Sequence, residues 1–288
     1  MQAALSDKVE HASDRAAGFR GSLRLGFACD GTGRTIITDR FRHGLFHLGK
    51  AYREDPYLVL QVVNPTAGVF ENDHLTASIS VAAGAHACVF APTSTQIYTA
   101  TGSGFAHSSV DISIDSGASL LYLPRWTVLH RGARFRQMTT IRAAGNASAF
   151  FLEPISAGRI AHGEFLEFDR LESRLEIFFD GHLALRERLD SGENKRPWIW
   201  KRGEESFAYL CTAYVIGPNA GVSLAKRIMD LQPFSSDGIS MGASAPEENL
   251  TVIRIFGKRS SLIRRALFHL HATLPLTAPS VFERINQL

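Results

Sequence analysis

A short pattern that occurs three times between residues 81 and 154 limits the folds open to this chain more than any other feature of its sequence. Each copy has a Gly, then small residues, an apolar and aromatic run and a Pro; the copies span residues 84–92, 117–124 and 145–154. They recur roughly every 30 residues, a spacing typical of stacked repeat architectures. We therefore expect strands that stack on one another and share one long core.

The segments that precede these copies have a different pattern. Residues 74–81 and 109–115 alternate apolar and polar side chains, which indicates strands with one buried and one solvent-facing side. The steps Gly84-Ala85 and Gly117-Ala118 join them to the apolar runs. The repeated module is thus predicted to be a half-buried strand, a tight turn and a more fully buried strand, in a mainly β, β-helix-like stacked-strand architecture. An ordinary antiparallel sandwich is the alternative.

Helical patterns occur only after residue 216. Asn219 can cap one helix and Ser260 or Ser261 a second; the expected apolar stripes are Leu224, Ile228 and Leu231, and Ile263, Ala266, Leu267, Leu270 and Leu274. Residues 235–248, rich in Ser, Gly, Ala and Glu, are predicted to form a flexible loop. We expect residues 1–18 to be a flexible N-terminal arm and residues 19–288 to be a single β domain that includes these helices.

Composition narrows the classes of partner and compartment. With 288 residues, 45% of them hydrophobic, the chain can bury a large core, and a formal net charge of +3 gives no argument for a nucleic-acid partner. The three cysteines, Cys29, Cys88 and Cys211, are far apart and odd in number, which suggests a reducing compartment without disulfides. The sequence has no secretory signal and no apolar run of membrane length. We expect a cytoplasmic protein without a membrane partner.

Signatures of catalysis are weak throughout the sequence. A phosphate-binding Gly-rich loop, a nucleophile elbow and a His-Glu-x-x-His zinc motif are all missing. The Ser-x-x-Lys spacing at residues 223–226 stands without its companion motifs and is read as a helix surface. The residues therefore favour a scaffold over an enzyme.

Four stretches together resemble one known family. They are Asn64-Pro65-Thr66-Ala67-Gly68 through Asp73, Thr95-Gln96-Ile97-Tyr98, Leu123-Pro124 through Gly132-Ala133-Arg134-Phe135, and Gly158-Arg159 through Gly163-Glu164. In order and spacing they are similar to the urease accessory protein family called UreD or UreH. The resemblance covers roughly residues 20–275.

This resemblance implies a β-helix-like fold with helices toward the C-terminus and a non-catalytic, chaperone-like role in urease metallocentre assembly, and so in nitrogen metabolism. It implies as partners the urease apoprotein and the accessory proteins F and G, of which G is a GTPase that carries nickel. GTP would be bound only by that partner, and nickel would pass through this chain in transit, with no cofactor held tightly. The implied residues on the nickel path are Asp73, Glu164 and Glu187, and the implied motif or structural residues are Asn64, Gly68, Thr95, Tyr98, Arg159 and Gly163.

A nickel conduit makes physical sense with carboxylate ligands. Carboxylates hold Ni²⁺ more weakly than an imidazole or thiolate cage does, so they can release it. A carboxylate inside a β core is costly unless it is paired or hydrated, so such a residue would itself indicate a water-filled passage. The chain also departs from the usual family pattern at four positions, Glu71, Asn72, Gln96 and His130.

Two further functions remain open from the residues alone. A solenoid-type carbohydrate-active enzyme would need paired carboxylates and stacking aromatic rings, for which Tyr122, Trp126, Trp198 and Trp200 are candidates. A generic protein-interaction module without a metal role is the other. The urease maturation scaffold is the function that the resemblance favours.

Overall fold

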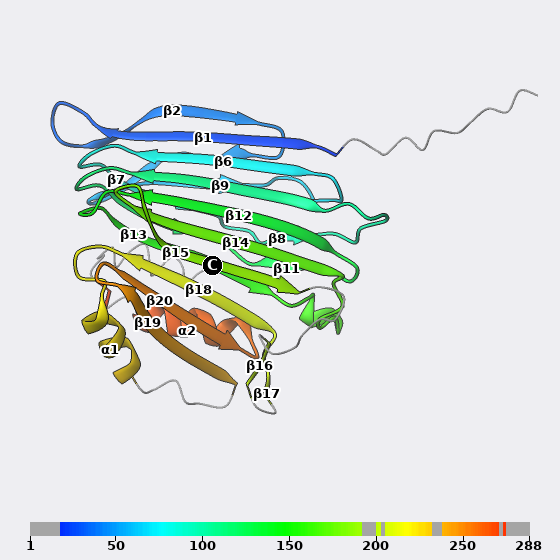
Figure 1. Cartoon of the computed structure of the whole chain (residues 1–288). Helices are drawn as coiled ribbons and strands as arrows, with labels where there is room; N and C mark the ends of the chain where they lie inside the picture. Colours follow the sequence, from blue (N-terminus) through cyan, green and yellow to red (C-terminus); the bar gives the residue numbers. More distant parts are fainter. Residues whose placement is uncertain (1–17, 192–199, 203–204, 232–237, 271–272, 275–288) are drawn as a thin grey trace, which may run out of the picture.

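The computed structural model describes residues 18–191, 200–202, 205–231, 238–270 and 273–274. In this part of the chain, two large β-sheets face each other and two helices lie beside the C-terminal strands (Figure 1). The predicted mainly β, stacked-strand architecture with helices toward the C-terminus is confirmed. The arm predicted for residues 1–18 and the tail after residue 274 fall almost wholly outside the described residues.

The first sheet has seven strands in the order β15-β14-β12-β9-β6-β1-β2. Strands β1, β6, β9, β12 and β14 are parallel to one another, and β2 and β15 pair antiparallel at the two edges. Their bounds are β1 Arg20–Cys29, β2 Thr35–His43, β6 His74–Val81, β9 Ala106–Ile114, β12 Arg134–Ala143, β14 Arg170–Phe179 and β15 His182–Ser191.

The second sheet contains the three copies of the repeat. Strands β7, β10 and β13 pair in parallel, with His86 and Ser148 both opposite Ser119. Its eleven strands are β3 His47–Leu48, β4 Tyr52–Glu54, β5 Tyr57–Val63, β7 His86–Phe90, β8 Thr95–Ile97, β10 Ser119–Leu123, β11 Thr127–Leu129, β13 Ser148–Ser156, β18 Tyr209–Ile216, β19 Ile239–Glu247 and β20 Leu250–Gly257. A small hairpin (β16 Lys201–Arg202, β17 Glu205–Ser206) and a 3-10 turn (η1 Ile160–His162) complete the list.

The glycine turns of the repeat carry the chain from one sheet to the other, so the module is one coil of a β-solenoid. Gly84 and Gly117 have φ values of +70° and +67°, which favour glycine, at the third position of β-turns closed by Ala85 N–H to Ala82 O and Ala118 N–H to Asp115 O. Successive turns also bond to each other, since Ser119 N–H donates to Ala85 O at 2.9 Å. The stacking therefore continues through the turns.

The two strand patterns follow from what covers each sheet. Strand β6 buries alternate side chains because only its inner face meets the other sheet, where Ile79 shares a core with Leu60 and Leu120. Strand β10 is almost wholly buried because its other face also packs: Leu121 belongs to a second core with Leu267 of helix α2 (Ser260–Leu270). A strand covered on both faces reads as a continuous apolar run.

Antiparallel strands close the parallel stack. In the first sheet, β2 pairs with the outer edge of β1 and β15 with the outer edge of β14. In the second sheet, β18, β20 and β19 follow β13 in that order. Strand β2 has mostly exposed residues and carries Asp39, Arg40, Arg42 and His43. Charged, solvated edges of this kind oppose pairing with another sheet.

Two local predictions about the C-terminal part were wrong. Helix α1 (Val222–Asp230) buries Leu224 and Ile228 as expected, but its N-cap residue is Gly221 instead of Asn219. Residues 239–247, predicted to be part of a loop, form strand β19, which pairs antiparallel with β20. The composition of β19 is poor for a strand, so pairing with β20 decides its conformation.

Helix α2 buries the predicted Ile263, Ala266, Leu267 and Leu270. Neither helix of the described chain is long and apolar enough to span a bilayer.

Candidate functional site

The four motif stretches meet along one side of the solenoid, in the connections between the strands of successive coils. Strand β8 pairs in parallel with β11, and β11 pairs with the end of β13; single bridges join Val69 to Ile97 and Thr99 to Ala133. Stretches that lie far apart in the sequence are therefore successive layers of one stack of loops. The side chains of Val69, Ile97 and Leu129 form part of its own buried core.

Asp73 stabilises the first layer of this stack, which is the loop between β5 and β6. Its side chain is buried, with 2% exposed, and its two carboxylate oxygens accept the backbone N–H groups of Phe19 at 2.7 Å and Phe70 at 2.8 Å. One carboxylate thus joins the start of β1 to the loop before β6. Both of its oxygens already have donors.

Gly68 and Tyr98 form the contact between the first and second layers. A Cβ on Gly68 would lie 2.4 Å from the carbonyl oxygen of Gln96 and 2.6 Å from the ring of Tyr98. That ring stacks on Phe70 at 4.6 Å, and its hydroxyl donates to Ala67 O. Position 68 therefore has no room for a side chain.

Gly68→Ala is expected to lower the free energy of unfolding by about 1–3 kcal/mol, because the added methyl group forces the two layers apart. Thermal unfolding of the two purified proteins measures this. Gly31→Ala is the matched control, since nothing lies within 4 Å of a Cβ there, and it should stay within about 0.5 kcal/mol of the unsubstituted chain. Equal effects of the two substitutions would contradict the proposed layer contact.

Arg159 and Glu164 form a closed ion pair around η1. The Arg159 guanidinium donates from Nε at 2.9 Å and Nη2 at 2.5 Å to the two carboxylate oxygens, and Arg131 N–H adds a bond of 3.2 Å. These hydrogen bonds, chiefly those from Arg159, lower the pKa of Glu164 to about 2. Gly163 ends η1 with φ +76°. The cluster is thus a well-bonded turn, and Glu164 stays ionised.

The four departures from the usual family pattern are accommodated locally. Gln96 and His130 contact each other, with 2.9 Å between Oε1 and Nε2. Asn72 has φ +68°, a conformation that Asn tolerates better than most residues. Glu71 accepts hydrogen bonds from Thr101, Gly102 and Gly104 and so closes the adjacent loop.

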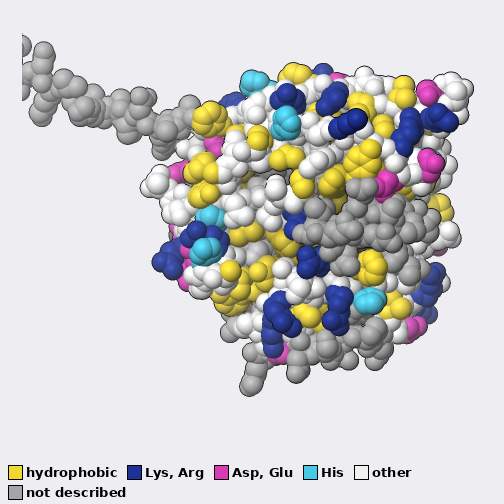
Figure 2. All heavy atoms as spheres, turned by 180° about the vertical axis from the view of Figure 1, so that it is seen from behind, with side chains coloured by type: hydrophobic (Ala, Val, Ile, Leu, Met, Phe, Trp, Pro, Cys, Tyr) yellow, Lys and Arg dark blue, Asp and Glu magenta, His cyan; other side chains and the backbone are white. Residues whose placement is uncertain are grey.

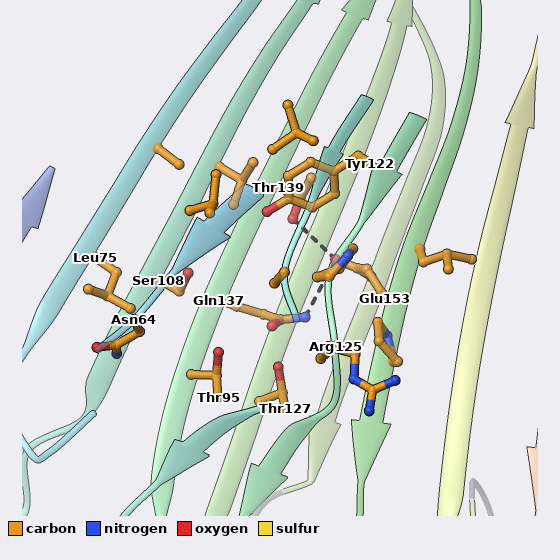
Figure 3. A pocket seen from close by; sticks show the side chains of 18 of the residues that line it. Asn64, Leu75, Thr95, Ser108, Tyr122, Arg125, Thr127, Gln137, Thr139 and Glu153 are labelled. Carbon is orange, nitrogen blue, oxygen red and sulfur yellow. Dashed lines mark hydrogen bonds between the residues drawn. The ribbon is translucent and has the colours of Figure 1, made fainter. Parts of the chain in front are cut away.

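A cavity of about 160 Å³ lies between the two sheets beside this stack (Figure 3). Apolar side chains from both sheets form part of its wall, and the polar side chains that line it are Asn64, Thr93, Thr95, Ser108, Ser109, Tyr122, Arg125, Thr127, Gln137, Thr139 and Glu153. Its size is that of several water molecules. The Asn64 amide nitrogen is buried and has no hydrogen-bond partner among the described residues, as expected if water fills the cavity.

Glu153 is the carboxylate of this cavity. Its Oε1 accepts from the Thr139 hydroxyl at 3.1 Å and from Gln137 Nε2 at 3.5 Å, contacts that Figure 3 shows as dashed lines. Burial raises the pKa of Glu153 to about 7; the Thr139 hydrogen bond opposes this rise, and the charge of Glu187 adds to it. Among the described residues Glu153 has no ion-pair partner. It therefore exchanges a proton near neutral pH.

Glu187, on strand β15, lies near Glu153, which is on β13. It accepts the Tyr214 hydroxyl at 2.8 Å and pairs with Arg254, whose side chain is 46% exposed. Tyr214 is itself buried in the core. Glu187 thus stands between the interior and a surface arginine.

The predicted metal residues do not come together. Asp73 and Glu164 lie in the loop stack with donors on their oxygens, and Glu187 lies on β15. In the described ranges no three His, Cys, Asp or Glu side chains are placed to hold one ion. Of the motif residues, Asn64 and Thr95 line the cavity, whereas Gly68, Tyr98, Arg159 and Gly163 support the loops.

Sequence reasoning missed Glu153. It is the single charged residue in the third copy of the repeat, in a run that is otherwise apolar or small. A lone carboxylate in a strand buried on both faces is the signal that could have found it.

Comparison with known proteins gives one consistent result. Residues 19–287 match the family described as "UreD urease accessory protein". The chain is 32% identical over 264 residues to a protein named urease accessory protein UreD from Opitutus terrae, covering 91% of this chain and 96% of that protein. Proteins of the same name from Cupriavidus pinatubonensis (28% identity; 86% of both chains) and Haloarcula marismortui (27%; 91% of this chain and 88% of that one) are also similar.

Proposed function

The chain belongs to the UreD family of urease accessory proteins, and from this premise we propose that it binds the urease apoprotein and accessory proteins F and G and conducts nickel to the urease active site. The family supports a role in urease maturation and, as a family of accessory proteins, a non-catalytic one. The partners and the nickel path are the proposed part. Nickel is cargo in this scheme, and GTP belongs to the partner GTPase.

The observation that carries the proposal is Glu153 in the interior cavity. A carboxylate with a pKa of about 7 and no ion-pair partner in the described chain is available to a divalent cation at neutral pH. Thr139 and Gln137 hold it toward a space of several water molecules, through which a partly hydrated ion could move. One carboxylate binds Ni²⁺ weakly, as transit requires.

The path we propose differs in emphasis from the one that the resemblance implies. Glu153 and Glu187 are its interior residues, because they lie close enough for one charge to raise the pKa of the other. Asp73 and Glu164 act instead by holding the loops beside the cavity. Their oxygens would have to give up backbone or arginine donors before binding a metal.

The carbohydrate-active alternative has less support. Its candidate stacking rings are occupied within the fold: Tyr122 stacks on Phe151 at 4.9 Å, Trp126 packs edge-on against Tyr209 at 5.0 Å, and Trp200 is 1% exposed. Trp198 lies outside the described residues. We place the function in the cytoplasm, where Cys29, Cys88 and Cys211 would remain outside disulfides, as they are in this structure.

Co-expression with the host's urease subunits and accessory proteins F and G tests the proposal. We expect a stable complex, and loss of urease activity when this chain is deleted. Glu153→Gln should leave the complex intact but lower the nickel content and activity of urease severalfold. Glu248→Gln, on an exposed residue, is the control and should change neither. Normal urease activity without this chain would refute the maturation role, and normal activity with Glu153→Gln would refute the path alone.

A further inference from the structure

A second cavity, of about 120 Å³, lies between helix α2 and the wall of the interior cavity. Arg125 and Arg264 both line it, with Ser260 at the first residue of α2. The rest of its lining is mostly apolar: Pro124, Trp126, Leu152, Pro154, Cys211 and Leu267. Arg125, Pro124, Leu152 and Pro154 also line the interior cavity, so the two spaces share a wall.

No acidic side chain of the described residues balances the charge of the two arginines. Neither forms an ion pair with a described residue, although both are only partly exposed. The Nε of Arg125 is buried and has no hydrogen-bond partner in this part of the chain. Burial and the charge of Arg264 lower the pKa of Arg125. Two guanidinium groups that face one small cavity and repel each other create a strong preference for an anion between them.

Figure 2 shows the face of the molecule seen from behind, where Lys and Arg side chains are spread with few Asp or Glu among them. The described charge on this face is thus mainly positive, in keeping with a partner that carries carboxylates. The apolar part of the lining favours an anionic group on a short apolar stem over a bare mineral ion. An aspartate, a glutamate or a chain terminus has this chemistry.

We propose that Arg125 and Arg264 form a binding site for a protein carboxylate. The fork of each guanidinium donates to the carboxylate oxygens, and the stem of the bound group lies against Leu152 and Leu267. The carboxylate comes from another protein, whose negative charge the two guanidinium groups complement. This inference is independent of the nickel path.

Thermal unfolding of the full chain with acetate exchanged for chloride at constant ionic strength tests the site. Acetate at several times its dissociation constant should raise Tm by about 2 °C through binding to the folded state. Arg264→Gln should abolish this shift. Arg264→Lys should reduce it, because an ammonium group cannot donate two parallel hydrogen bonds to one carboxylate as a guanidinium does. The control is Arg265→Gln, on the exposed neighbour in the same helix, which should keep the full shift.

Acetate should act on the unsubstituted chain itself, because the site is open to a carboxylate from another protein. Equal responses of the Arg264 and Arg265 variants to acetate would overturn the site. A larger, Arg264-dependent shift with phosphate than with acetate would overturn its assignment to a carboxylate.

Discussion

Glu153→Gln is expected to raise the free energy of unfolding at pH 8 by about 3 kcal/mol and to leave it nearly unchanged at pH 4. The folded chain holds the proton of Glu153 up to a pKa of about 7, whereas an unfolded glutamate loses it near pH 4.5. As pH rises between these values, the unfolded state gains stability relative to the folded state. Glutamine resembles the protonated form and removes this loss.

Urea unfolding at a series of pH values measures the effect. The difference between the variant and the unsubstituted chain should grow from pH 4.5 to pH 7 and then stay constant. Glu248→Gln, on an exposed carboxylate, should show no such growth. A flat difference across this range would mean that Glu153 has an ordinary pKa. Nickel binding should in turn strengthen over the same range and release a proton, which calorimetry in two buffers would detect.

Asp73→Ala is expected to lower the free energy of unfolding by about 3 kcal/mol or more, because it leaves the amides of Phe19 and Phe70 without an acceptor. Asp73→Asn should lower the free energy of unfolding by less, since the amide oxygen of Asn can still accept one of the two hydrogen bonds. Thermal unfolding of the purified variants measures both. The loss of urease activation by these variants should follow their loss of stability.

Asp111→Ala is the control for this series. Its side chain is 57% exposed on β9 and its contact with Arg142 is 3.5 Å long, so its removal should change stability by less than about 0.5 kcal/mol. Should Asp73→Ala keep full stability and yet abolish urease activation, Asp73 would be a residue of the nickel path and the structural role given to it here would be wrong.

The fold was largely predictable from the sequence, because the same local sequence pattern recurs in each coil. The Gly turns and the contrast between alternating and continuous apolar runs report directly which face of a strand is covered. Strand β19 was not predictable in this way. Its Ser, Gly, Ala and Pro residues have no strand pattern, and it is a strand because β20 offers it an edge.

The site was predictable only in part. The motif stretches identified the stack of loops, but the sequence does not show that the oxygens of Asp73 and Glu164 are occupied by donors from distant residues. The cavity depends on side chains that two facing sheets bring together, and these are far apart in the chain. The departures Gln96 and His130 looked independent, and only the structure pairs them.

The antiparallel strands at the margins of the stack set the length of the molecule. The last coil of a parallel solenoid has strands with unpaired backbone N–H and C=O groups at its outer edge. Such an edge can pair with a coil of another molecule, and repeated pairing gives a fibre. Strand β2 at one end, and β15 with the series β18, β20 and β19 at the other, reverse direction and so end the repeat. The protein thereby remains a discrete particle of fixed length.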